Sequence, residues 1–378
     1  MGVRTTAAIL LSVAGIAAFS ILPVMIGAIA DARGLSASEA GYVAAADLCG
    51  FALAAVAAVF WVGRLNARLA AGLGLLGALV GNLASLNATG FDTLIGVRAL
   101  AGVGAGTVYA VAMSVLSRSA RAERDFGIMV AAQIVYQVVA LLILPRWVAV
   151  WGTGAIFLSL AGTVGVAFLA ILPGAMSVDT PSQTTATGVR SRPGWLALAA
   201  VALFSVNLGA LWTYIERIGV QMSLTSSQTG TILAVALALS VLGALAASAV
   251  GGGAGWRKPF IVAVLAQLAA LALLTEHAGI SAFTIGAVLY SLAWAFAVPL
   301  LYTMVAATDP SGRLIVLAPA AQAIGAGLGP ALAGSLLGST SYLPVNGLAA
   351  AALVLALICV PRRSRLGRAQ PASGTGSV

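Results

Sequence analysis

Two ionisable residues lie inside long apolar runs of this 378-residue chain. Asp47 is in the run 41–61, and Arg98 is in the run 94–116. A charge in the hydrocarbon interior of a bilayer is costly, so such residues are candidates for function. Asp47 follows Gly41 by six residues, and Arg98 lies near the matching end of its run. Six residues span about 9 Å of a helix, so we expect the two charges to lie at a similar depth and to pair.

A buried carboxylate beside a cation can exchange a proton when the distance between the two groups changes. The cation favours the charged carboxylate, whereas burial favours the neutral form. We therefore predict that Asp47 takes up and releases a proton and that Arg98 modulates this exchange. Two alternatives stay open: a permanent structural ion pair, and an Asp47 that is wetted from the nearer membrane face.

Neutral polar and aromatic side chains inside the apolar runs form a second group of candidates. Gln133 and Gln137 are four residues apart and share one helix face, and Tyr290 and Trp294 have the same spacing. The candidates for lining an internal cavity are Tyr109, Gln133, Tyr136, Gln137, Asn207, Trp212, Tyr290, Trp294 and Gln322. Each could instead form a hydrogen bond between helices or lie at the membrane interface.

Glycine is abundant, with 44 residues, and two clusters of it lie inside apolar runs. Small residues allow membrane helices to approach closely, and proline can kink them. The candidates for helix packing or gating are Gly102, Gly104, Gly106, Gly325, Gly329 and Pro330. No strand is expected before these glycines, so they do not indicate a nucleotide site.

Glu216 and Arg217 end the apolar run 195–216. Charged residues at the end of a membrane helix commonly reach the lipid head groups. We expect such an anchor here, with a gate or a ligand contact as the alternative. Asp92, Glu276 and His277 are expected in short loops at the same membrane face.

The composition indicates a membrane protein. Hydrophobic residues make up 61% of the chain and charged residues 8%, against about 25% charged in an ordinary soluble domain. This balance excludes a soluble enzyme, a nucleic-acid-binding domain and a disordered chain. Roughly 20 apolar residues cross the bilayer as a helix. We predict an all-α polytopic membrane protein with 12 transmembrane helices, at 6–30, 41–61, 69–88, 94–116, 126–146, 153–173, 195–216, 229–250, 259–276, 282–306, 314–338 and 344–361.

Positive charge is distributed unevenly between the loops. If successive runs alternate in direction, one side receives only Arg33, Arg146 and Arg217 of the 19 Lys and Arg residues, and Arg98 lies within a run. Basic loops remain in the cytoplasm. We therefore expect both termini in the cytoplasm and the protein in the cytoplasmic (inner) membrane, surrounded by lipid. The same asymmetry accounts for the formal net charge of +9 without a nucleic-acid partner.

A Ser-, Thr- and Pro-containing segment divides the chain into two sets of six runs, and its composition is typical of a flexible linker. The expected organisation is an N-terminal six-helix bundle at 1–173, a cytoplasmic linker at 174–194, a C-terminal six-helix bundle at 195–361 and a basic cytoplasmic tail at 362–378.

An internal repeat supports this division. The segments 34–41 and 223–230 both have the pattern of a capped helix start, and they lie 189 residues apart. At this offset the second half has Ala236 and Ala287 in place of the two charged residues. We therefore expect the proton chemistry to be confined to the first half.

The segment 98–106, with the pattern R-x-x-x-G-x-G-x-G in the fourth run, is similar to an element of the major facilitator superfamily. The twelve runs, the central linker and the cytoplasmic termini also resemble this family over essentially the whole chain. The resemblance implies two bundles that rock around a central cavity by alternating access, in a functional monomer. It also implies that the first, fourth, seventh and tenth runs line the cavity and that the second, fifth, eighth and eleventh close its sides.

Two departures from the family are visible. The loop 63–68 is basic but lacks the Asp that the family's motif between its second and third helices usually carries. The fifth run lacks the glycine-rich pattern of the family's drug antiporters, and a comparable run lies at 325–334 instead. These departures put in doubt the cytoplasmic gate contact that the motif supplies, and they weaken a drug/proton antiporter assignment.

The leading interpretation is a secondary active transporter, and not an enzyme, that moves a small organic solute with protons. Because Arg98 alone would be available to bind an anion, we expect a neutral, weakly acidic or aromatic solute. Efflux of hydrophobic compounds is the alternative within transport, and a non-transporting membrane receptor or assembly partner is the alternative of another class. The sequence has no phosphate-binding loop, metal-ligand cluster or nucleophile triad, so we expect no cofactor and no metal.

Overall fold

The computed structural model describes residues 3–62, 65–117, 119, 122–171, 192–250, 257–275, 279–308, 314–338 and 341–361. The secondary structure of these residues is helical. The helices are α1 (Val3–Ser20), α2 (Leu22–Arg33), α3 (Ala37–Trp61), α4 (Ala67–Asn87), α5 (Phe91–Leu116), α6 (Ala122–Trp151), α7 (Gly154–Ile171), α8 (Arg192–Gln221), α9 (Ser226–Val250), α10 (Arg257–Leu273), α11 (Ile280–Thr308), α12 (Leu314–Leu336) and α13 (Leu343–Cys359).

These helices confirm the predicted all-α polytopic class. Within the described residues, nine helices are long and apolar enough to cross a membrane, and α13 is a shorter apolar helix. Each predicted run from the second onward corresponds to one helix, whereas α1 and α2 together cover the first.

The first run is therefore not the continuous helix that we expected over 6–30. It is interrupted at Ile21, and Pro23 lies in the first turn of α2. Proline has no backbone N–H, so the carbonyl of Phe19 loses the donor that a continuous helix would give it, and the residue before a proline is disfavoured in helical geometry. The chain bridges the break with bonds from Ile21 N to Ala17 O (3.3 Å) and from Met25 N to Ile21 O (2.9 Å).

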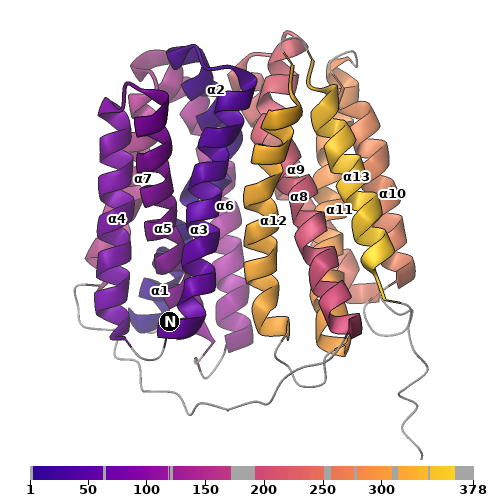
Figure 1. The fold of residues 1–378 in the computed structure, drawn as a ribbon, viewed down its shortest axis with the longest axis horizontal. Coiled ribbons are helices and arrows are strands. Elements are labelled where there is room, and N and C mark those ends of the chain that lie inside the picture. The colour runs from indigo at the N-terminus through magenta and orange to yellow at the C-terminus, as the bar shows by residue number, and fades with distance from the viewer. Residues whose placement is uncertain are drawn as a thin grey trace, which may run out of the picture.

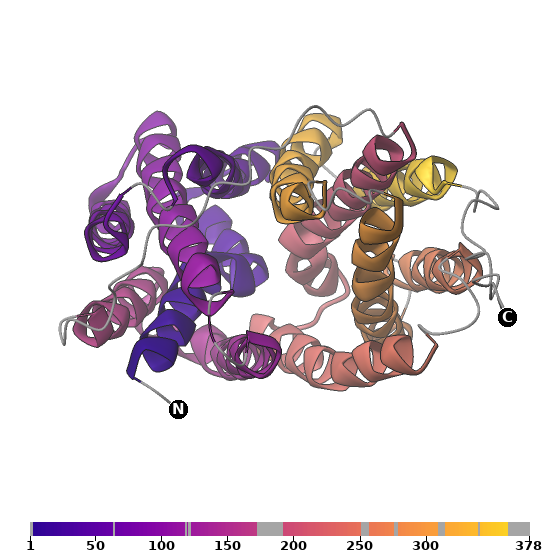
Figure 2. The same cartoon turned by 90° about the horizontal axis from the view of Figure 1, so that it is seen from below.

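Figures 1 and 2 show α1–α7 on one side of the molecule and α8–α13 on the other, which we call the first and second halves. We call the end that holds the start of α1 the terminal face and the other end the far face (Figure 1). The halves meet most extensively along three helix pairs, α3 with α12, α6 with α9, and α2 with α8. Most of the predicted linker and the predicted tail lie outside the described residues, but residues 192–194 already belong to α8.

Glycines set the spacing of α5 and α12. A Cβ at Gly102 would collide with the carbonyl of Asp47 on α3, and a Cβ at Gly104 would collide with the backbone of α4. A Cβ at Gly325 or Gly329 would likewise meet the backbone of α8. Because backbones approach this closely only where one residue lacks a side chain, α5 is held between α3 and α4, and α12 lies directly against α8.

The close packing of α5 predicts a clear difference between two glycines of that helix. We expect Gly102→Ala to lower the stability of the purified protein by about 1–3 kcal/mol, because the added methyl group forces α3 away from α5. Gly96→Ala is the matched control, since a Cβ at Gly96 meets nothing within 4 Å. Thermal unfolding in detergent measures both. Equal melting temperatures would contradict this account of the packing.

Candidate functional site

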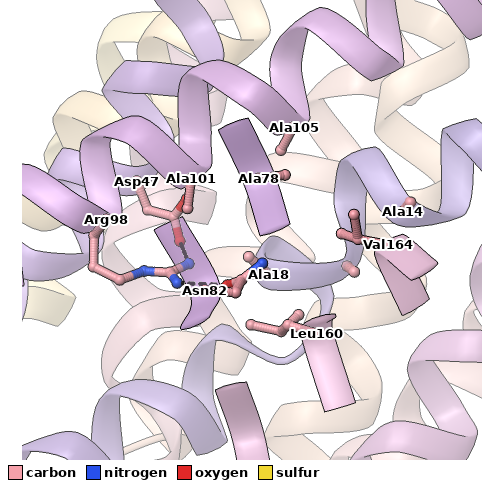
Figure 3. Close-up of a pocket in the computed structure, with 11 residues that line it drawn as sticks. Ala14, Ala18, Asp47, Ala78, Asn82, Arg98, Ala101, Ala105, Leu160 and Val164 are labelled. Carbon is pink, nitrogen blue, oxygen red and sulfur yellow. Dashed lines mark hydrogen bonds and ion pairs between the residues drawn. The ribbon is translucent and has the colours of Figure 1, made fainter. Parts of the chain in front are cut away.

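The two charged residues singled out in the sequence form a buried cluster in the first half. Arg98 on α5 is 0% exposed, and Asp47 on α3 is 3% exposed. The Nη2 atom of Arg98 donates to Asp47 Oδ2, and Nη1 donates to Asn82 Oδ1 on α4 at 2.8 Å. Figure 3 shows the guanidinium between these two partners. The arginine thus joins α3, α4 and α5.

The surroundings of this cluster are almost entirely apolar. Small side chains such as Ala14, Ala78 and Ala101 line a cavity of about 10 Å³ beside it (Figure 3). The ring of Phe157 on α7 lies 5.8 Å from the guanidinium carbon of Arg98, within the range of a cation–π contact. In this conformation Asp47 is therefore paired and shielded, and not open to the far face.

Asn82 was not among the residues that we expected to be functional. It is an amide inside the apolar run 69–88, and it is 5% exposed. Its position inside an apolar run could have identified it as a candidate, because a buried amide needs a hydrogen-bond partner. Its Oδ1 accepts the hydrogen bond from Nη1 of Arg98.

A second cavity, of about 50 Å³, lies between the halves. Four predicted candidates line it: Gln137 from α6, Trp212 from α8, and Tyr290 and Trp294 from α11. Its other lining residues are Phe19, Leu208, Leu237 and Ser291. None of these eight residues is charged. The structure thus brings five predicted runs together around one small space, and half of its lining residues are aromatic.

The other predicted cavity residues lie elsewhere. The ring of Tyr109 lies against that of Phe51 on α3, and Gln133 Nε2 is buried without a hydrogen-bond partner among the described residues. Thr163 on α7 lies 3.5 Å from the hydroxyl of Tyr136, and Gln322 is hydrogen-bonded to Tyr302 on α11. Asn207 donates to Gln267 on α10 at 3.2 Å. The bonds of Tyr136, Asn207 and Gln322 join two helices of the same half, which is the alternative that the sequence left open for them.

The break in the first run lies at the edge of the central cavity. Trp212 Nε1 donates to the carbonyl of Phe19 at 3.0 Å, and Gln137 Nε2 donates to the carbonyl of Ser20 at 3.3 Å. The Trp212 bond crosses from one half to the other. Sequence reasoning missed this feature, although Pro23 was the signal for it.

Near the far face, two residues of α8 bind the first half. Arg217 forms a bidentate ion pair with Asp31 of α2, with N–O distances of 2.6 and 2.7 Å. The hydroxyl of Tyr214 donates to the carbonyl of Ala37 at 2.9 Å. We call Asp31, Tyr214, Glu216 and Arg217 the interhalf cluster. It holds the two halves together at this face.

Glu216 does not reach the lipid head groups as we expected. It is 1% exposed, and its Oε1 accepts a hydrogen bond of 2.6 Å from Ser226 on α9. Its Oε2 lies 3.2 Å from Arg217 Nε and packs against Gly27 of α2. Because Gly27 has no side chain, α2 approaches α8 closely enough to cover the carboxylate.

The fold and the two sites define an all-helical, multi-pass membrane protein of two bundles with a cavity between them. A family model described as Major Facilitator Superfamily matches residues 7–313. This chain belongs to that family. Family membership indicates a transporter rather than an enzyme. Among curated proteins, no sequence matches this chain significantly.

Solved structures of three transporters share the fold. The nucleoside transporter NupG has a TM-score of 0.73 and 14% identity, covering 95% of this chain and 98% of that one. A D-xylose-proton symporter has a TM-score of 0.71 and 13% identity, covering 95% and 97%. An inward-facing bacterial homologue of the human lysosomal transporter Spinster has a TM-score of 0.67 and 15% identity, covering 95% and 94%.

The ion pair at the far face predicts how the halves separate. We expect Asp31→Asn to weaken the contact between α2 and α8 by about 1 kcal/mol, which is about a five-fold rise in the population that opens there. Amide hydrogen exchange of peptides covering 22–36 and 212–221 measures this opening. Asp92→Asn is the control, because Asp92 is exposed near the same face, at the start of α5. Equal exchange in both variants would show that the ion pair does not hold this face.

Proposed function

We propose that this protein is a secondary active transporter that moves a small organic solute across the cytoplasmic membrane by alternating access, coupled to protons. The observation that carries the proposal is the uncharged, aromatic cavity between the two halves of a superfamily member. A solute site between two bundles can open to either side of the membrane when the bundles tilt relative to each other.

The cavity lining favours a neutral or aromatic solute. Trp212, Tyr290 and Trp294 offer ring surfaces, and Gln137 offers an amide. Binding a phosphorylated or strongly acidic compound would need several guanidinium or ammonium groups, and the described lining residues have none. Arg98 is unsuited to this task because it is buried against Asp47 and Asn82.

Asp47 is the proposed proton carrier. In this structure Arg98 donates a hydrogen bond to its carboxylate. A movement of α3 relative to α5 would remove that donor and favour the protonated acid. Proton uptake and helix movement would then be coupled. The permanent ion pair is the competing account, and the experiment below separates the two.

Under the same proposal the terminal face is cytoplasmic, which the distribution of positive charge between the loops supports. The interhalf cluster then closes the outer side, while Asp47 and Arg98 lie in the outer part of the first half. Efflux of hydrophobic compounds is the second candidate, since the same aromatic walls would suit them. The direction of solute movement under an imposed proton gradient decides between uptake and efflux.

The proposal predicts that transport of the solute also moves protons across the membrane. Vesicles containing the purified protein and a pH-sensitive dye should acidify or alkalinise when a transported solute is added from a panel of nucleosides, sugars and neutral aromatic compounds. With Asp47→Asn we expect this proton movement to fall to the level of protein-free vesicles, because the side chain can no longer exchange a proton. Unchanged proton movement in this variant would overturn the role of Asp47.

Loss of folding must be separated from loss of coupling. Removing one member of a buried ion pair costs about 3–5 kcal/mol, so Asp47→Asn alone could lower the yield. The double variant Asp47→Asn with Arg98→Gln removes both charges. We expect it to recover stability without recovering proton movement, whereas a purely structural ion pair would let both return. Asp92→Asn serves as the control for a loss of carboxylate charge.

A further inference from the structure

The break between α1 and α2 leaves the carbonyl of Phe19 without its helical donor beside the central cavity, and the next carbonyl, that of Ser20, accepts a bond from a side chain. Pro23 has no N–H, so the carbonyl of Phe19 cannot receive the bond that a continuous helix would supply. Phe19 itself lines the cavity. In an apolar interior such a carbonyl needs a donor from elsewhere in the protein or from a ligand.

The present donors are side chains of two other cavity-lining helices. Trp212 of α8 donates to Phe19 O at 3.0 Å, and Gln137 of α6 donates to Ser20 O at 3.3 Å. Both of these side chains line the same cavity as Phe19. Side-chain donors can swing away from a carbonyl, whereas the backbone donor of a continuous helix cannot. These two carbonyls are therefore acceptors that can change partner.

We propose that the carbonyls of Phe19 and Ser20 form the acceptor subsite for the transported solute, and that Trp212 and Gln137 occupy these acceptors when no solute is bound. This inference rests on the proposed transport function and names its substrate class. The solute is a flat, neutral ring compound that carries N–H or O–H donors. Its ring lies against the aromatic side chains, and its donors replace the indole and amide donors.

The chemistry of the subsite sets this class. Carbonyl oxygens accept hydrogen bonds and repel anions, so a carboxylate or phosphate would be rejected. An organic cation is disfavoured, because the described lining residues include no carboxylate to offset the loss of its hydration. A hydrocarbon ring without donors would leave Phe19 O unpaired once Trp212 had moved, which is costly inside the protein. A neutral solute with donors satisfies all three conditions.

The position of Trp212 links solute binding to movement. Its bond to Phe19 joins the two halves, so separating them at this depth breaks it. A solute donor on Phe19 O replaces the lost bond and favours the separated state. A solute that binds the separated state more tightly than the closed state lowers the relative free energy of the separated state by the difference between the two binding free energies.

Probes that differ only in their donors test the subsite. The binding of uracil, hypoxanthine and indole to the purified full-length protein is compared with that of 1,3-dimethyluracil, 1,7-dimethylhypoxanthine and 1-methylindole, by titration calorimetry. We expect at least one donor-bearing probe to bind about five-fold more tightly than its methylated counterpart, the effect of about one hydrogen bond. If no pair shows this difference, the assigned substrate class is wrong.

Variants then test whether this difference in affinity arises at the break between α1 and α2. Trp212→Phe keeps a ring but removes the competing N–H, so the donor-bearing probe should bind about five-fold more tightly while its methylated counterpart is unchanged. Trp294→Phe makes the same substitution in the same cavity and should affect both probes alike. Pro23→Ala restores a backbone donor for Phe19 O and should weaken the donor-bearing probe alone. A Trp212→Phe variant that changes both probes equally would overturn the proposal, and it decides the matter even if Pro23→Ala does not fold.

Failure of this inference can be told from failure of the proposed function. If D-xylose or another solute without a flat ring drives proton movement while no probe pair shows a donor preference, transport stands and the acceptor subsite is wrong. If the probe pairs and Trp212→Phe behave as expected but no solute moves protons, the subsite stands and proton-coupled transport is wrong.

Discussion

A bilayer offers no water to its interior, so each polar group there must find a partner inside the protein. This constraint organises the described structure. Arg98 is shared between Asp47 and Asn82, Glu216 is bonded to Ser226, and the carbonyls at the break are bonded to Trp212 and Gln137. Each of these bonds joins different helices. Polar groups that are isolated in the sequence thus form the hydrogen bonds that hold the helices together. A change of hydrogen-bond partner at one of these groups therefore requires a helix to move.

The small residues determine which of these partners can meet. Gly102 lets the backbone of α5 approach α3 at Asp47, and Gly27 lets α2 approach α8 at Glu216. In both places the absence of a Cβ brings an ionisable side chain under cover. Association of helices in lipid depends on close packing and interhelical hydrogen bonds rather than on the hydrophobic effect. Glycine and charge therefore act together here: the close approach at Gly102 brings Arg98 within bonding distance of Asp47, and that at Gly27 covers Glu216.

Much of this was available from the sequence. The apolar runs gave the helices, and the depth of Asp47 and Arg98 along their runs predicted a pair that the structure contains. Helical spacing also brought Tyr290 and Trp294 to one cavity. The break at Ile21 was missed because a proline is common in membrane helices and its effect depends on whether another helix supplies donors. Glu216 was misplaced because its burial depends on Gly27, which is distant in sequence. Asn82 was overlooked because an amide shows its role only beside the arginine that it binds. Such outcomes depend on contacts between helices, which hydropathy and spacing along one helix do not specify.

The end of α8 joins the cavity to the far face. Within six residues it carries Trp212 on the Phe19 carbonyl, Tyr214 on the Ala37 carbonyl and Arg217 on Asp31. All three bonds cross to the first half, and all three are carried by one continuous helix. A rigid helix cannot release one of them far without straining the others, so exchange of a solute donor for Trp212 and opening of the ion pair are expected to occur together. The cavity and the far face are about one and a half helical turns apart along α8, close enough that no longer pathway is needed to couple solute binding to the release of this face.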